Sequence, residues 1–283
     1  MRVADVGSTS AIRYSARNRV PWRTRQFPAE DTVVTIPNTQ HVPFFAGLSE
    51  SSRDRVLNLA TEVRAHRGEQ LFHTGDPARQ SYLLLTGKVK LSRSAKHQPS
   101  PPPARLGERA HKRVAKPQVR ESLLWVMGPG DMFGELSVFD QGTRSSTATA
   151  VTAATMLRFE GGQLAALVGQ HQDVALSMLH VLATRLRRSD DHTTGMVLSD
   201  VSGRVAWLLM HLLTRFGPDS DPGTDNPSWV RHDLTQTELS QIVGASRETV
   251  NKVLTDFESR GVIEVRPREF RVLQPQRLLA RME

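Results

Sequence analysis

The chain has 283 residues and a mass of 31.5 kDa; 38% of its residues are hydrophobic, the formal net charge is +8 and the sequence pI is about 10.5. This length predicts two domains with extensions, and the positive charge favours a polyanionic partner such as nucleic acid. The absence of cysteine excludes disulfide frameworks, thiolate-bound zinc, cysteine-ligated iron–sulfur clusters and cysteine nucleophiles.

The first 40 residues are rich in arginine and show little apolar periodicity. They predict a mobile basic arm, for which an inert solubilising tail is an equal alternative. This stretch lacks the apolar core of a signal peptide. No run of the chain approaches the ~20 apolar residues that cross a bilayer. We therefore expect a protein of the reducing cytoplasm without a membrane partner.

Between residues 62 and 160, short strand-like runs such as SYLLLT and KVKLSR alternate with glycine-containing turns. Many short strands at this spacing predict an antiparallel barrel or jelly roll, which we place at residues 41–172. His66, His73 and His171 show no metal-ligand spacing, so we expect no metal site.

A proline-rich, basic segment at residues 94–121 interrupts these strands. Its prolines predict extended, solvated backbone, and we interpret the whole segment as a long loop inserted within a hairpin. The positive charge permits a phosphate-binding role, but a solvated segment without function is the more common case.

The stretch FGELSVFDQGTRSS, residues 133–146, combines a glycine, a carboxylate, a guanidinium and two hydroxyls. These groups suit a sugar phosphate, because a guanidinium forms charge-assisted pairs with phosphate and a carboxylate accepts from hydroxyls. For Glu135 and Arg144 alone, a structural ion pair is the simpler interpretation.

Residues 173–200 contain no proline and one glycine, which predicts one long helix. Along this helix, one row of residues recurs at alternating intervals of three and four positions. This spacing is typical of the seam of a coiled coil and predicts a homodimer. The seam becomes polar at Ser189 and Thr193, and Asp190 lies beside it. The seam residues are Leu179, Leu182, Leu186, Ser189, Thr193 and Met196.

Residues 234–260 predict a helix-turn-helix. Thr235 and Glu238 form a capping-box pattern, Gly244 ends the first helix and Ser246 caps the second. The sequence VIEVRPREFRVLQP follows and predicts a hairpin wing. The second helix exposes side chains that can bind base edges, and the wing arginines suit phosphates. The expected DNA contacts are Thr235, Gln236, Ser246, Arg247, Glu248, Thr249, Asn251, Lys252, Arg266 and Arg268.

With these motifs, the chain resembles the cyclic AMP receptor protein (Crp/Fnr) family of bacterial transcription regulators over residues 43–280, and actinobacterial Crp-type regulators in particular. FGELSVFDQGTRSS resembles the family's phosphate-binding cassette, DVSGRVAWLL its hinge and QIVGASRETVNKVL its recognition helix. The resemblance implies an α+β fold. Its parts are an antiparallel β-roll or jelly roll that binds a cyclic nucleotide, a long dimerisation helix at 173–200 and a winged helix-turn-helix domain at 201–283.

The resemblance also implies that cyclic AMP is the allosteric effector. Gly134 and Glu135 would contact its ribose, and Arg144 and Ser145 its phosphate. The chain departs from the family pattern at three positions. In the pocket, Ser189 stands where threonine is frequent, and Asp190 stands where Ser or Asn is usual, which adds a negative charge near the adenine. In the recognition helix, Lys252 replaces a typical arginine and cannot form the bidentate hydrogen bonds of a guanidinium. The expected pocket residues are Gly134, Glu135, Leu136, Ser137, Arg144, Ser145, Ser146, Ser189 and Asp190.

The leading hypothesis is a homodimeric regulator that binds palindromic promoter DNA in response to cyclic AMP, works with RNA polymerase and associates with the nucleoid. The alternative is a ligand-independent regulator whose pocket has lost function. An enzyme is not expected, because the sequence shows no nucleophile–base constellation and no metal cluster.

Overall fold

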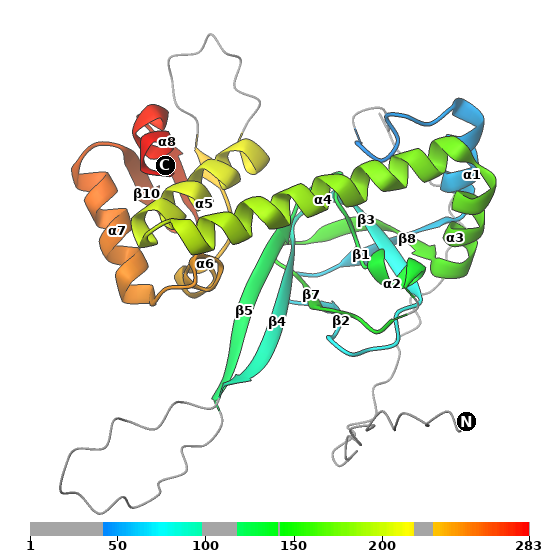
Figure 1. The fold of residues 1–283 in the computed structure, drawn as a ribbon, viewed down its shortest axis with the longest axis horizontal. Helices are drawn as coiled ribbons and strands as arrows, with labels where there is room; N and C mark the ends of the chain where they lie inside the picture. The colour runs from blue at the N-terminus through cyan, green and yellow to red at the C-terminus, as the bar shows by residue number, and fades with distance from the viewer. Residues whose placement is uncertain (1–41, 98–117, 141, 218–228, 283) are drawn as a thin grey trace, which may run out of the picture. The chain divides into compact units, whose positions relative to one another are not determined.

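The computed structural model describes residues 42–97, 118–140, 142–217 and 229–282 (Figure 1). The predictions for the arm at 1–40 and for the basic residues of the loop at 98–117 lie outside these ranges. In the described part of the chain, no helix has the length and apolar character that a membrane span requires.

Two four-stranded antiparallel sheets form the β-roll, with strand orders β1-β8-β3-β6 and β2-β7-β4-β5. Buried positions such as Val63, Leu84 and Met156 face the space between the sheets, where they join one apolar cluster. The alternation of buried and exposed positions fixes the register, for example at Val63↔Met156 in the β1–β8 pair. The strands are β1 Ala60–Ala65, β2 Gln70–Phe72, β3 Gln80–Thr86, β4 Val89–His97, β5 Gln118–Met127, β6 Met132–Phe133, β7 Thr147–Ala150 and β8 Ala154–Glu160.

The prediction of a loop over the whole of residues 94–121 was wrong at its ends. β4 and β5 continue their antiparallel pairing to His97↔Gln118, and Figure 1 shows this hairpin extending away from the rest of its sheet. Residues 94–97 and 118–121 contain no proline, so each of them can donate a backbone hydrogen bond to the ladder.

Three short helices, α1 (Glu50–Asn58), α2 (Leu136–Phe139) and α3 (Gly161–Gln170), accompany the β-roll. α1 is joined to the start of the long helix α4 (Gln172–Leu198) through Asp173. The Asp173 carboxylate accepts from Ser49 N at 3.0 Å, from Ser49 Oγ at 2.9 Å and from Ser52 Oγ at 2.9 Å. These hydrogen bonds, led by that from the Ser49 backbone, hold the pKa of Asp173 far below its usual range.

α4 confirms the predicted long helix, and α5 (Val201–Phe216) follows it after a break at Ser199 and Asp200. Asp200 caps α5 by accepting from Gly203 N at 2.7 Å. The seam residues Leu179 and Leu186 are 61% and 63% exposed, and Leu176 beside them is 58% exposed. One side of α4 therefore carries an apolar stripe that the described residues leave uncovered.

The C-terminal part is a winged helix-turn-helix, as predicted. Its apolar core includes Leu209, Ile242, Leu254 and Phe270 and also takes in Leu123 of β5. The wing is a three-stranded antiparallel sheet of order β10-β11-β9. The elements are β9 Val230–Arg231, α6 Gln236–Val243, α7 Arg247–Ser259, β10 Ile263–Arg266, β11 Glu269–Val272 and α8 Pro275–Met282.

Candidate ligand pocket and nucleic-acid interface

Gly134 allows the chain to pass close to a buried arginine. It follows β6 with φ +76°, and its carbonyl accepts from Arg144 Nη1 at 2.9 Å. A Cβ atom at this position would lie 2.5 Å from the same nitrogen and 3.3 Å from the Gln80 carbonyl oxygen. Both the left-handed backbone and the close approach require glycine.

Arg144 is held beneath this turn with its guanidinium only partly satisfied. The residue is 4% exposed, and Cζ lies 4.1 Å from the centre of the Phe72 ring. Phe72 stacks on Tyr82 at 6.0 Å between ring centroids. Burial lowers the pKa of Arg144, although nearby acidic groups oppose the effect. Its buried Nε has no hydrogen-bond partner among the described residues, so the side chain presents a free donor.

Glu135 is fully buried and forms an ion pair with Arg185 of α4. Its second carboxylate oxygen, Oε2, is buried and accepts no hydrogen bond within the described residues. An unpaired buried acceptor is costly unless a ligand or water satisfies it. The site thus combines a free guanidinium donor with a free carboxylate acceptor, as a sugar phosphate requires. Within the described residues, no cluster of three or more potential metal ligands occurs.

Arg185 is a site residue that the sequence analysis missed. It precedes Ser189 by one helical turn, and residues four apart share a helix face. A basic residue at that position could have drawn attention, but its partner Glu135 is 50 residues away in sequence. Periodicity within one helix cannot identify such a partner.

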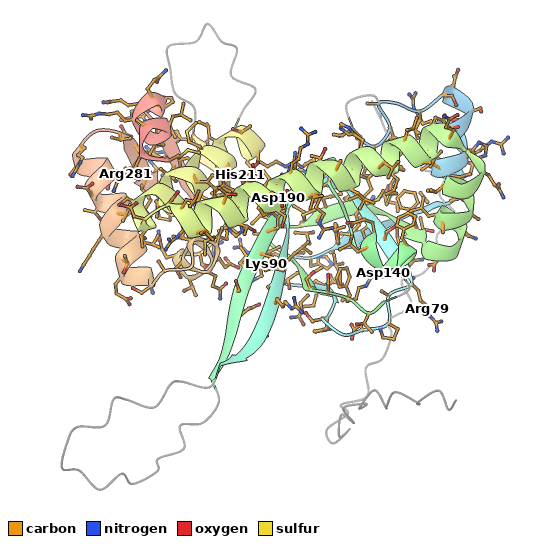
Figure 2. All side chains as sticks on the ribbon, in the orientation of Figure 1. Arg79, Lys90, Asp140, Asp190, His211 and Arg281 are labelled. Atoms are coloured by element: carbon orange, nitrogen blue, oxygen red, sulfur yellow. The ribbon has the colours of Figure 1, made fainter. Side chains whose placement is uncertain are left out.

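The remaining predicted pocket residues divide between two elements. Leu136 and Ser137 lie in α2, where Leu136 is exposed. Ser145 is exposed and Ser146 buried, next to Arg144. Ser189 and Asp190 are exposed on α4, and Figure 2 shows Asp190 along that helix. Among the described side chains, neither bonds to the cassette; the Ser189 carbonyl accepts from Thr193 Oγ1 at 2.8 Å.

The helix-turn-helix has the predicted caps. Thr235 Oγ1 accepts from Glu238 N at 3.2 Å while Glu238 Oε2 accepts from Thr235 N at 2.7 Å. Gly244 ends α6 in the left-handed region at φ +67°. Ser246 caps α7 by accepting from Thr249 N at 3.2 Å. Both helices therefore begin at the residues that the sequence indicates.

The predicted DNA contacts lie mainly on the exposed side of this unit. Val250 and Leu254 bury one face of α7, and Asn251 is half-buried. Gln236, in the first turn of α6, is also half-buried, and its Oε1 has no partner in the described part of the chain. The exposed predicted contacts are Thr235, Ser246, Arg247, Glu248, Thr249, Lys252, Arg266 and Arg268.

Two families of protein domains match the chain. The Crp-like helix-turn-helix domain matches residues 203–281, and the cyclic nucleotide-binding domain matches residues 111–171. The curated relatives that the chain matches are named as transcription regulators and not as enzymes.

Curated relatives extend the match over most of the chain. A CRP-like cAMP-activated global transcriptional regulator of Mycobacterium tuberculosis is 36% identical over 84% of this chain and 95% of its own length. The cyclic AMP receptor protein of Thermus thermophilus is 30% identical over 80% of this chain and 89% of its own. Among solved structures, FixK2 from Bradyrhizobium japonicum has the same fold, with a TM-score of 0.63 at 19% identity over 79% of this chain and 98% of its own.

Proposed function

Because this chain belongs to the Crp/Fnr family of transcription regulators, we propose that it is a homodimeric DNA-binding regulator that responds to cyclic AMP. The single observation that carries the proposal is the site of two buried, oppositely charged residues, Glu135 and Arg144, each with one unsatisfied polar atom. The similarity to a relative described as cAMP-activated supports the choice of nucleotide.

In this proposal the cassette residues bind the sugar phosphate. Arg144 and Ser145 donate to the phosphate, and Glu135 Oε2 accepts from a ribose hydroxyl beside Gly134. Leu136, Ser137 and Ser146 complete the cassette side of the pocket. Ser189 and Asp190 bind the adenine from α4, where Asp190 can accept from its amino group.

Arg185 connects this pocket to the dimerisation helix. It pairs with Glu135, so a ribose hydroxyl that donates to Glu135 changes the environment of an α4 side chain. A ligand alters the equilibrium between two dimer states only through its different affinity for them. We infer that the Glu135–Arg185 pair is one source of that difference.

The exposed stripe on α4 forms the dimer interface in this proposal. Leu179 and Leu186 are more than half exposed, and their coiled-coil spacing suits a second copy of the same helix. A two-fold dimer presents its two α7 helices to successive major grooves, ~34 Å apart, and so binds a palindrome.

α7 is the recognition helix of this regulator. Arg247 donates to guanine and Glu248 accepts from cytosine, while Asn251 and Lys252 lie one turn further along the helix. The other predicted contacts bind the sugar–phosphate backbone of the DNA. They are the caps Thr235 and Ser246, and also Gln236, Thr249, Arg266 and Arg268. Such a protein works at the nucleoid in the cytoplasm, with RNA polymerase as its partner.

Calorimetric titration of the purified protein with cyclic AMP tests the effector. We expect micromolar binding near one ligand per subunit, and at least tenfold weaker binding to Arg144→Gln. The exposed Arg79 provides the control Arg79→Ala, which should bind as the wild type does. The absence of both heat and thermal shift in the wild type would favour the ligand-independent regulator, and equal affinity in Arg144→Gln would reject the pocket.

A further inference from the structure

A tryptophan lies between two arginines on the outer face of the wing. Trp229 directly precedes β9, and its ring centre lies 3.9 Å from Cζ of Arg266 and 5.2 Å from Cζ of Arg271. The pairing Phe270↔Val230 places those two residues on the inner side of the sheet. Because successive side chains alternate, Trp229 and Arg271 lie on the outer side.

The two arginines differ in what else they bind. Arg271 donates twice to Glu264, at 2.9 and 2.7 Å, and this pair raises the pKa of Arg271. The carboxylate near Arg266 is Glu269 at 3.7 Å, which is too long for a hydrogen bond. The side chain of Arg266 is 59% exposed. Stacking therefore holds its guanidinium while the N–H groups stay available in its plane.

The backbone of the wing turn is hydrogen-bonded to the segment that leads into the helix-turn-helix. Arg268, at the turn, has φ +66°, and its carbonyl accepts from His232 N at 3.0 Å and Asp233 N at 3.2 Å. Asp233 lies two residues before Thr235, the N-cap of α6. The wing that carries Arg266 is therefore tied to the residues that begin the helix-turn-helix.

We propose that Trp229 is a positioning residue that holds the Arg266 guanidinium for a phosphate of the DNA backbone beside the base-reading helix. The inference rests on the proposed DNA-binding function and adds a residue to it. A free arginine loses rotamer entropy when it binds a phosphate, whereas one already stacked on an indole has lost part of it beforehand. Trp229 itself contacts no DNA in this arrangement.

The test measures DNA affinity by fluorescence anisotropy over a series of salt concentrations, on an operator duplex and on a random duplex. Trp229→Ala should weaken binding about two- to fivefold on both duplexes. The slope of log K against log salt should become shallower by about 0.9, the value of one lost phosphate contact. Trp229→Phe keeps an aromatic face and should restore most of the affinity and the slope.

A double-mutant cycle separates positioning from wing stability. Trp229→Ala should add little to Arg266→Ala, because both remove the same contact. Arg271→Ala, which removes the arginine already bound by Glu264, is the matched control and should keep the wild-type slope.

A loss of affinity in Trp229→Ala with the wild-type slope, or a loss that adds fully to that of Arg266→Ala, would reduce Trp229 to a packing residue and overturn the inference. So would an unchanged slope in Arg266→Ala. If the wild type fails to prefer the operator over random DNA, the proposed function fails instead, and the slopes on random DNA still decide the role of Trp229.

Discussion

Lys90 of strand β4 binds the carboxylate that caps the helix-turn-helix: its Nζ lies 2.7 Å from Oε1 of Glu238. The other oxygen of Glu238 closes the capping box with Thr235. Nearby, Lys88 Nζ lies 2.7 Å from Oδ2 of Asp233 and 2.6 Å from the Arg231 carbonyl oxygen. Two lysines at the start of β4, one directly before the strand and one within it, thus hold the segment that leads into α6.

Replacement of Lys90 should therefore destabilise the protein and loosen the start of α6. Lys90→Met keeps the aliphatic stem but leaves the half-buried Glu238 without its cation, at an expected cost of ~1–3 kcal/mol. Urea unfolding gives the free energy, and hydrogen exchange should show faster opening at the amides of α6.

Lys252→Met is the control for this change. Lys252 is exposed on α7, and no ion pair joins it to another described residue. Its removal should leave the free energy of unfolding within about 0.5 kcal/mol of the wild type. Equal losses in the two variants would mean that the Lys90–Glu238 pair contributes nothing.

The imidazole of His211 should make stability depend on pH. Its ring stacks on Trp207 with 5.3 Å between centroids and lies 4.9 Å from the Trp125 ring. Burial, followed by the charges of Arg188 and Arg215, lowers the pKa of His211 from 6.5 to about 4; Asp131 opposes this effect and His192 adds to it. Between pH 6.5 and about 4, His211 is therefore protonated in the unfolded chain but neutral in the folded chain.

The sign follows from that difference. The contribution of His211 to the free energy of unfolding is fully present above pH 6.5. It is lost as the pH decreases towards 4, which lowers the free energy of unfolding by roughly 1–3 kcal/mol. Urea midpoints at pH 7.5 and 5.0 measure the loss, which should shrink in His211→Gln. Part of the loss should remain, because burial also lowers the pKa of His232 to about 4. The control is His66→Gln, at an exposed position. Its free energy of unfolding should decrease between pH 7.5 and 5.0 as much as that of the wild type.

The local part of the fold could be predicted from the sequence because its signals are local. Thr235 and Glu238 are three residues apart, and Gly244 and Ser246 mark the turn directly. Each residue acts on backbone within a few positions of itself, so the pattern and the structure carry the same information. The two helices and the turn were accordingly predicted correctly.

Contacts between distant segments could not be predicted in this way. Arg185 and Glu135 are 50 residues apart, and Lys90 and Glu238 are 148 apart. A helical period places Arg185 on a face but does not identify what that face meets. The hairpin shows a second limit: Pro99 and Pro117 led us to treat residues 94–121 as one loop, whereas the proline-free ends pair as strands.

The apolar stripe on α4 should control the oligomeric state. Leu186→Arg places a charge at the centre of the seam and should convert the proposed dimer to a folded monomer, because a buried unpaired charge is strongly unfavourable. Light scattering gives the mass, and circular dichroism checks the fold. Asp191 lies five residues further on, opposite the seam in the heptad, so Asp191→Arg should remain dimeric. A dimeric Leu186→Arg would place the interface elsewhere.

The last prediction concerns base recognition by α7. Arg247 is exposed in the first turn of the helix, directly after the cap Ser246, which is the end that a recognition helix presents to base edges. Arg247→Ala should relax the preference for guanine at one position of each half-site, at a cost of ~1–3 kcal/mol on the operator. Selection of binding sites from a random pool, followed by affinity measurements on single-base variants, detects both effects.

Arg260 at the other end of α7 gives the control. It is exposed, forms the C-cap of α7 and pairs with Asp256 at 2.9 Å, so Arg260→Ala removes the same charge without touching the leading turn of the helix. Its selected sites should match those of the wild type. If Arg247→Ala loses equal affinity for operator and random DNA, then Arg247 contacts a phosphate, and base recognition must begin with Glu248 and its neighbours further along the helix.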